Sequence, residues 1–268
     1  MRQLGFIGAG NMGSAILRGV IADGFVKANQ IAVCDANRKQ LEDLSEELPG
    51  VIFTTNPDEL AEECQNIILA VKPGVLGGVL EQIKPNLAGK NVISIAAGWT
   101  TAMLGKALDG VEVGCLRVMP NTPAMVGEGM TALCKENTLS PEALAFAKGI
   151  FDAVGRTVML PERLFDGVTA ISGSSPAYVF MMIEAMADAG VREGIPRGQA
   201  YEMAAQAVLG SALMVLNSGS HPAALKDAVC SPGGTTIDAV EMLERRGFRS
   251  AIMDAMDACA EKSRSMSR

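Results

Sequence analysis

Apolar residues in the first part of the chain fall into short runs separated by stretches with helical spacing. The runs that predict buried strands are residues 4–7, 31–34, 67–71, 92–95 and 113–119. Residues 11–23 and 37–47 carry apolar side chains at helical spacing. Short apolar runs that alternate with helices are typical of a parallel sheet covered by helices on both faces.

The pattern changes near Pro161, beyond which long helices rich in Ala and Met replace the strand-like runs. We expect these helices at residues 176–189, 199–216, 236–245 and 248–263, with Pro176 at the start of the first and Gly190 just after its end. The first two are apolar around most of their circumference and must be buried. Residues 161–268 can hardly bury them alone, so we expect another subunit to cover part of this surface. The pattern thus predicts an α/β domain at residues 1–160 and a helical domain at residues 161–268.

A glycine fingerprint lies between the first strand and the first helix. The motif G-x-G-x-x-G consists of Gly8, Ala9, Gly10, Asn11, Met12 and Gly13. In a dinucleotide site the first glycine permits a tight turn, the second lets the backbone approach the pyrophosphate, and the third lets the helix pack on the strand. The pyrophosphate then lies at the helix N-terminus, which favours anions. The alternative is an ordinary glycine-rich turn. We predict a nicotinamide dinucleotide site.

The second strand is followed by residues that bear on which dinucleotide binds. Asp35 follows Gly13 at close to the usual spacing of about 20 residues for an acid that binds the ribose 2′-hydroxyl of NAD. Arg38 and Lys39 come within one helical turn of it and are suited to the 2′-phosphate of NADP. Asp35 has a second interpretation, as the N-cap of the helix that begins near Asn37. The cofactor is therefore expected to be NADP or NAD.

Three further loops follow apolar runs and are expected to line the crevice at the carboxyl ends of the strands: residues 70–73, 96–98 and 119–123. Pro73, Pro120 and Pro123 stop the strands. Asn121 is available to hydrogen-bond a carboxamide. Plain strand termination is the alternative interpretation of these residues.

Two segments rich in Gly and Ser interrupt the helical part, at residues 169–178 and 225–236. The second contains Ser-Pro-Gly-Gly-Thr-Thr, from Ser231 to Thr236, directly before a predicted helix. Free N–H groups and hydroxyls at a helix start suit a small carboxylate. A capped helix start with no ligand explains the same residues.

Composition limits the remaining function classes. The net charge is -7 and no basic run occurs, which argues against a nucleic-acid partner. The six cysteines form no Cys-x-x-Cys pair and none lies near the single histidine, His221, so no metal site is expected. Unpaired thiols favour the cytoplasm. The N-terminus lacks the long apolar segment of a signal peptide, and no stretch predicts a membrane span.

These motifs, taken in order, resemble the pyrroline-5-carboxylate reductase family. The resemblance rests on residues 6–13, 70–73, 119–123, 172–178 and 225–237, and the Ser-Pro-Gly-Gly-x-Thr segment after Leu-Lys-Asp is its most specific part. It implies a Rossmann-type, doubly wound sheet domain followed by a helical substrate-binding and dimerisation domain. It also implies a homodimer, and dimers in this family often assemble into decamers.

The resemblance also implies roles for individual residues. Those implied for the substrate carboxylate and ring are Ser231, Gly234, Thr235 and Thr236, with the Thr236 hydroxyl close to the ring nitrogen. Positions near the substrate are Glu162, Thr169 and Lys226, and cofactor contacts are Asn56, Val71, Lys72, Pro73 and Ala97. Two residues depart from the family pattern: Ser175 stands where Gly is common, and Asp35 stands where some members carry a serine that meets the 2′-phosphate.

The implied reaction is transfer of a nicotinamide hydride to the C=N carbon of 1-pyrroline-5-carboxylate, which gives L-proline. A protonated imine is already electrophilic, so positioning is expected to supply much of the rate. His221 is expected to be structural, and Lys226 either supports the anionic substrate or lies at the surface as a helix-stabilising residue. Two alternatives remain at this point: a dehydrogenase of the hydroxyacid type, and a dinucleotide-binding regulator without turnover.

Overall fold

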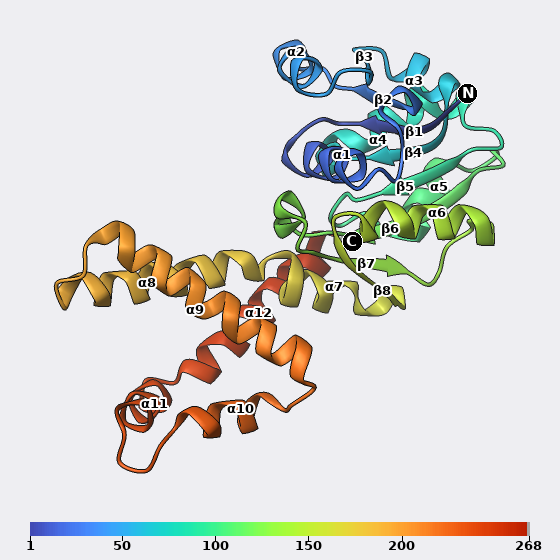
Figure 1. The fold of residues 1–268 in the computed structure, drawn as a ribbon. Helices are drawn as coiled ribbons and strands as arrows, with labels where there is room; N and C mark the ends of the chain where they lie inside the picture. Colours follow the sequence, from blue (N-terminus) through green and yellow to red (C-terminus); the bar gives the residue numbers. More distant parts are fainter. Residues whose placement is uncertain (267–268) are drawn as a thin grey trace. The chain divides into compact units, whose positions relative to one another are not determined.

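The structure is a computed structural model that describes residues 1–266 (Figure 1). Its strands are β1 (Arg2–Ile7), β2 (Ile31–Cys34), β3 (Ile52–Thr54), β4 (Cys64–Leu69), β5 (Asn91–Ser94), β6 (Gly114–Met119), β7 (Gly129–Cys134) and β8 (Gly155–Leu160). The helices interleaved with them are α1 (Asn11–Asp23), α2 (Arg38–Glu47), α3 (Pro57–Glu63), α4 (Pro73–Ile83), α5 (Thr101–Ala107) and α6 (Pro141–Asp152). The helices after β8 are α7 (Phe165–Val168), α8 (Ser175–Arg192), α9 (Arg197–Ser218), α10 (Pro222–Val229), α11 (Thr235–Arg245) and α12 (Phe248–Met266). The five predicted strands correspond to β1, β2, β4, β5 and β6.

The eight described strands form one sheet in the order β3-β2-β1-β4-β5-β6-β7-β8. The first six are parallel, and their order is that of a doubly wound dinucleotide-binding fold. The five predicted strands are parallel, as expected, and the sheet continues at one edge with two strands that were not predicted: β7 runs antiparallel to β6, and β8 follows the direction of β7. Residues 120–128 between β6 and β7 are too few for the crossover that a parallel neighbour requires.

Side chains of the parallel strands alternate between two cores, one on each face of the sheet. Leu4, Phe6 and Val33 belong to one core, which is covered by α1, α2 and α6. Ile7 and Cys34 belong to the other, which is covered by α3, α4 and α5. Helices therefore cover both faces, as the strand pattern predicted.

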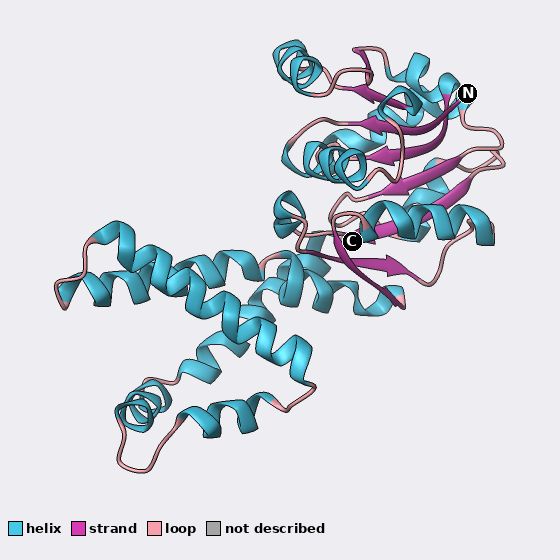
Figure 2. Cartoon of the chain, in the orientation of Figure 1, coloured by secondary structure: helices cyan, strands magenta, loops and turns pink. Residues whose placement is uncertain are grey.

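By their internal contacts the residues divide into two compact units. Among the described residues, the sheet unit comprises Met1–Ser174 together with residues 259–266, and the helical unit is Ser175–Ala258. This division by contacts falls after Ser174, since Phe165 and Val168 of α7 belong to a core of the sheet unit, and the domain boundary at residues 160–161 stays a prediction. All the strands among residues 1–266 lie in the sheet unit, and the described elements after Ser174 are helices (Figure 2). None of the described helices has both the length and the apolar character needed to cross a membrane.

The predicted end of the first long helix is wrong. Helix α8 continues through Gly190 to Arg192, and the chain turns at Gly194, where φ is +94°. A Cβ atom added to Gly190 would lie 3.4 Å from the Cβ of Ala200 on α9. Gly190 therefore serves the close packing of two helices and does not end one.

Candidate functional site

The glycine fingerprint forms a tight turn between β1 and α1. Gly8 has a φ of +106°, and a Cβ atom there would lie 2.6 Å from the carbonyl oxygen of Ala70. A Cβ atom on Gly13 would overlap the carbonyl oxygen of Gly8. Both positions therefore require glycine for backbone packing, as the motif predicted.

The N-terminus of α1 is open at this turn. Gly10 is the N-cap residue, no side chain caps the helix, and a Cβ atom on Gly10 would meet no atom within 4 Å. Asn11 is exposed and Met12 is half-buried, while Ala9 is buried. An uncapped helix start beside an open backbone position fits a pyrophosphate.

Asp35 reaches back from the end of β2 to the glycine turn. Its Oδ2 atom accepts a hydrogen bond from the backbone N–H of Ala9 at 2.6 Å, and its Oδ1 atom accepts one from the N–H of Asn37 at 2.8 Å. The N-cap of α2 is Asn37, whose side chain accepts a bond from Gln40. The N-cap interpretation of Asp35 is therefore wrong, and its carboxylate lies at the glycine turn.

A hollow of about 430 Å³ lies against α2 and the end of β3. The residues that line it are Arg38, Leu41, Glu42, Ser45, Phe53, Thr54 and Thr55. Exposed Asn56 follows in the chain and caps α3 by accepting a bond from the N–H of Asp58 at 3.1 Å. The structure thus brings Arg38 to a hollow at the edge where the second half of a dinucleotide lies in this fold.

The loops after β4 and β5 are joined to each other. Indole Nε1 of Trp99 donates a hydrogen bond to the carbonyl oxygen of Pro73 at 2.9 Å. Lys72 is exposed at the start of α4, whereas Val71 and Ala97 are half-buried. Because β4 is parallel to its neighbour β1, and β5 is parallel to its neighbour β4, these loops lie at the same sheet edge as the glycine turn.

Asn121, after β6, is 8% exposed and both ends of its amide are engaged within the protein. Its Oδ1 atom accepts the N–H of Met130 at 2.8 Å, and its Nδ2 atom donates to the carbonyl oxygen of Ser172 at 3.0 Å. These hydrogen bonds hold two other segments of the chain, and the contact of this side chain with a carboxamide stays a prediction.

Glu162 lies in a polar cluster within the sheet unit. Its Oε1 atom accepts bonds from the N–H of Thr101 at 2.7 Å and from Nη1 of Arg117 at 2.9 Å, and its Oε2 atom accepts the Thr101 hydroxyl at 2.5 Å. Burial opposes ionisation of Glu162, but the hydrogen bonds from Thr101 and the charge of Arg117 outweigh it and lower the pKa of this carboxyl group. Glu162 is therefore held as a carboxylate.

Arg117 is a residue that the sequence analysis did not single out. Its side chain is 7% exposed, pairs with Glu162 and stacks over the ring of Phe165, with 4.7 Å from Cζ to the ring centroid. The sequence did carry a signal for Arg117: it is an arginine inside the apolar run of β6, and a buried guanidinium requires a partner.

Thr169, four residues after Phe165, donates its hydroxyl to the Phe165 carbonyl oxygen at 2.9 Å.

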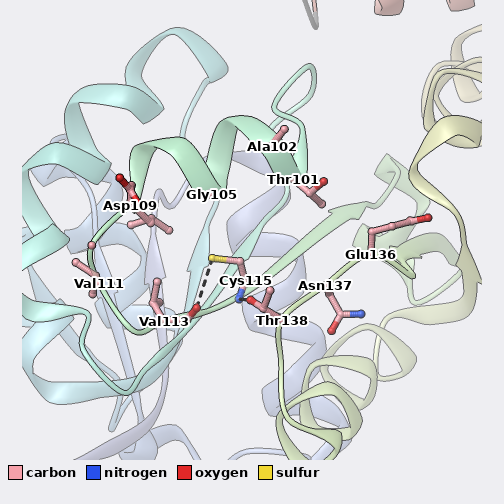
Figure 3. Close-up of a pocket in the computed structure, with 12 residues that line it drawn as sticks. Thr101, Ala102, Gly105, Asp109, Val111, Val113, Cys115, Glu136, Asn137 and Thr138 are labelled. Carbon is pink, nitrogen blue, oxygen red and sulfur yellow. Dashed lines mark hydrogen bonds between the residues drawn. The ribbon is translucent and has the colours of Figure 1, made fainter.

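Another hollow, of about 570 Å³, lies between α5 and the segment after β7 (Figure 3). Cys115 lies in its wall, with Thr101 and Ala102 at one end and Glu136 and Asn137 at another. No predicted site residue lines it. Two of its lining residues contact Glu162: Thr101, through its N–H and hydroxyl, and Glu136, whose Oε2 atom accepts the backbone N–H of Glu162 at 2.7 Å.

In the helical unit, the Ser-Pro-Gly-Gly-Thr-Thr segment forms the start of α11. The N–H of Gly234 donates to the carbonyl oxygen of Ser231 at 3.0 Å, and Gly233 has a φ of +67°. Gly234 is the N-cap residue and no side chain caps the helix. Thr235 is exposed and Thr236 is half-buried. No side chain therefore caps the first N–H groups of α11, and the alternative of a capped helix start does not describe this segment.

Lys226, on α10, pairs with its neighbour in the chain. Its Nζ atom lies 2.7 Å from Oδ1 of Asp227, and the hydrogen bond to this carboxylate and its negative charge raise the pKa of the lysine.

His221 is the N-cap of α10, where its Nδ1 atom accepts the N–H of Ala223 at 3.1 Å. This contact gives the only histidine a structural role, as expected.

Comparison with known proteins shows what the chain resembles along its whole length. It is 48% identical to the pyrroline-5-carboxylate reductase of Escherichia coli (strain K12) over 268 residues, which cover 100% of this chain and 99% of that one. The chain belongs to the pyrroline-5-carboxylate reductase family. Residues 162–266 also match the family model for pyrroline-5-carboxylate reductase dimerisation, and residues 3–98 match the model for NADP oxidoreductase, coenzyme F420-dependent.

Members of the family from distant organisms share both sequence and fold with the chain. The pyrroline-5-carboxylate reductase of Arabidopsis thaliana is 41% identical, covering 99% of this chain and 96% of that one. The crystal structure of Plasmodium falciparum pyrroline carboxylate reductase with NADP bound is 34% identical, with a TM-score of 0.90 and coverage of 100% and 98%. The resemblance inferred from the motifs is confirmed, as are the Rossmann-type sheet and the helical C-terminal part.

Proposed function

We propose that the protein reduces 1-pyrroline-5-carboxylate to L-proline with NADPH or NADH, as the last step of proline biosynthesis. The observation that carries this proposal is the 48% identity over the whole chain to a reductase of that name. The hydroxyacid-dehydrogenase alternative needs a catalytic lysine on a C-terminal helix, and Lys226 is instead paired with Asp227. A regulator without turnover has no need of the uncapped start of α11.

The dinucleotide site would be built from the sheet unit. The open backbone at Gly10 and the uncapped N-terminus of α1 would hold the pyrophosphate, and the predicted loop contacts are Asn56, Val71, Lys72, Pro73 and Ala97. The bound cofactor supplies the hydride. Support for NADP comes from Arg38 beside its hollow and from the relative that was crystallised with NADP. Asp35 at the glycine turn supports NAD.

The substrate carboxylate would bind Ser231, Gly234 and Thr235 at the start of α11, where Ser231 and Thr235 supply hydroxyls and the first N–H groups after the N-cap residue Gly234 have no side-chain cap. Thr236 would act as the catalytic hydroxyl that holds the ring nitrogen in line for hydride addition. Glu162, Thr169 and Lys226 would lie near the substrate. Since the substrate enters as a protonated imine, these groups need to orient it rather than supply a strong acid.

We also propose that the helical region from residue 161 dimerises, in a chain that works as a homodimer in the cytoplasm. The match to a dimerisation family and the exposed apolar side chains of α8 and α9 support the dimer. Decamers of the kind that the family forms are a further prediction, which a mass measurement of the purified protein tests. Free thiols at all six cysteines support a reducing compartment.

The test of the activity combines the purified protein with NADPH or NADH and pyrroline-5-carboxylate and follows the absorbance of the reduced nicotinamide. Loss of absorbance is expected with at least one cofactor, and no loss with either would overturn the proposal. Thr236→Ala is expected to lower kcat about tenfold or more with dinucleotide affinity unchanged. Thr236→Ser, which keeps the hydroxyl, is the matched control and should retain most of the rate.

A further inference from the structure

The amide of Asn121 joins three segments that are far apart in the chain. It lies in the loop after β6, accepts the N–H of Met130 at the start of β7, and donates to the carbonyl oxygen of Ser172. Ser172 belongs to a short π-helix, Thr169–Gly173, that leads into α8. With 8% of its surface exposed, Asn121 makes these bonds in a buried environment, where polar pairs hold their geometry.

The Ser172 carbonyl oxygen needs a hydrogen-bond donor from outside its own helix. In an α-helix its partner would be the N–H of the fourth residue ahead, but residue 176 is proline and has none. The helix is widened at the same point, because the N–H of Ser174 bonds to the carbonyl oxygen of Thr169 five residues back. The Nδ2 atom of Asn121 replaces the missing donor.

The π-helix is also packed against the end of β6. A Cβ atom on Gly173 would lie 2.7 Å from Cε of Met119, the last residue of that strand, so no larger residue fits there without movement. The carboxyl end of β6 lies at the sheet edge that carries the other loops of the dinucleotide site. One buried amide thus links that edge to the segment that contains Thr169.

We propose that Asn121 is a positioning residue, which holds the π-helix Thr169–Gly173 against the carboxyl end of β6 and touches neither cofactor nor substrate. Its effect on catalysis rests on the proposed function, because Thr169 lies in the segment that it holds. Its effect on the π-helix does not depend on that function. This role replaces the expected contact between Asn121 and a carboxamide.

The main test is Asn121→Asp, which keeps an acceptor for Met130 and places an oxygen against the Ser172 carbonyl oxygen where the amide donated. Amide hydrogen exchange of residues 169–174 is expected to become faster by about tenfold or more. In turnover, kcat is expected to fall by about tenfold to a hundredfold while the Kd for NADPH, from fluorescence titration, changes by less than about twofold. Unchanged exchange, or a weaker Kd with kcat preserved, overturns the proposal.

A rescue variant separates positioning from a general loss of stability. Pro176→Ala restores an N–H four residues after Ser172, so the loss of kcat caused by Asn121→Asp should be several times smaller in the double variant. An equal loss in both backgrounds counts against the proposal. If Asn121→Asp does not fold, Asn121→Ser, whose hydroxyl is too short to span the same gap, is measured in the same way. Absence of turnover in the unsubstituted protein overturns the proposed function, and hydrogen exchange still decides the role of Asn121.

Discussion

The sheet unit and the helical unit differ in where their apolar side chains lie. In the sheet unit, large side chains such as Phe6, Phe151 and Phe165 are fully buried in cores made by its own strands and helices. In Ser175–Ala258 the buried apolar residues are only the alanines Ala187, Ala200 and Ala204, and exposed large apolar side chains follow α8 and α9.

This difference teaches that the two units obtain their stability from different sources. A sheet with helices on both faces closes its own cores. A helix that is apolar around most of its circumference, such as α9, needs a partner on every side. Exposed apolar surface of this extent marks an interface, so the helical unit is expected to depend on a second copy while the sheet unit does not.

The largest expected effect comes from a substitution that prevents the helical unit from packing against a second copy. Met186 lines an apolar groove of about 430 Å³ with Val208 and Val215. Met186→Glu places a charge in the proposed interface, at a cost of several kcal/mol, and is expected to convert the dimer to a monomer without turnover. Light scattering coupled to gel filtration measures the mass. Ile52→Glu, at a similarly exposed apolar residue of the sheet unit, is the control and should keep the dimer mass.

The next effect concerns the glycine turn of the sheet unit, where close backbone packing determines which glycine can be replaced without loss of stability. Gly13→Ala places a methyl group against the Gly8 carbonyl and is expected to lower the free energy of unfolding by about 1–3 kcal/mol. Gly10→Ala meets open space, so stability should stay near that of the wild type while dinucleotide binding weakens. Urea unfolding and fluorescence titration measure the two quantities. Equal stability losses in both variants would contradict this account of the turn.

A smaller effect concerns the charge cluster of the sheet unit. Because the folded pKa of Glu162 is lowered, its contribution to stability is fully present above its unfolded pKa of about 4.3 and is lost as the pH falls through the folded value. Glu162→Gln is expected to cost about 1–2 kcal/mol at pH 7, with a difference from wild type that shrinks below about pH 4. Urea unfolding at both pH values tests this. Glu128→Gln, at an exposed carboxylate, is the matched control for the change of Glu to Gln.

The smallest expected effect concerns cofactor choice. Asp35→Asn removes the negative charge near the site of a 2′-phosphate, and a like charge at about 4 Å in water costs about 1 kcal/mol. The ratio of the Kd for NADH to the Kd for NADPH should therefore rise about fivefold. Titration with both dinucleotides measures it, and Asp43→Asn, an exposed acid on α2, is the control. An unchanged ratio would remove Asp35 from the choice between NAD and NADP.

Much of the fold was predictable because it depends on local patterns. Apolar spacing placed α1 at Asn11–Asp23 and β2 at Ile31–Cys34, the same bounds that the structure shows. The glycine turn was predictable for a similar reason, since G-x-G-x-x-G describes backbone conformations of neighbouring residues. The family followed from motifs spread along the chain.

The sequence by itself therefore determined strands β1, β2, β4, β5 and β6, the glycine turn and the family, because periodicity and turn conformation are properties of neighbouring residues. Only the tertiary structure decided the pairing of Arg117 with Glu162, the bond from Asn121 to Ser172 and the place of Asp35 against Ala9. Each of these joins residues far apart in the chain, and a buried polar group takes whichever partner the packing brings within reach. The sequence shows that such a group needs a partner, and the fold selects which one.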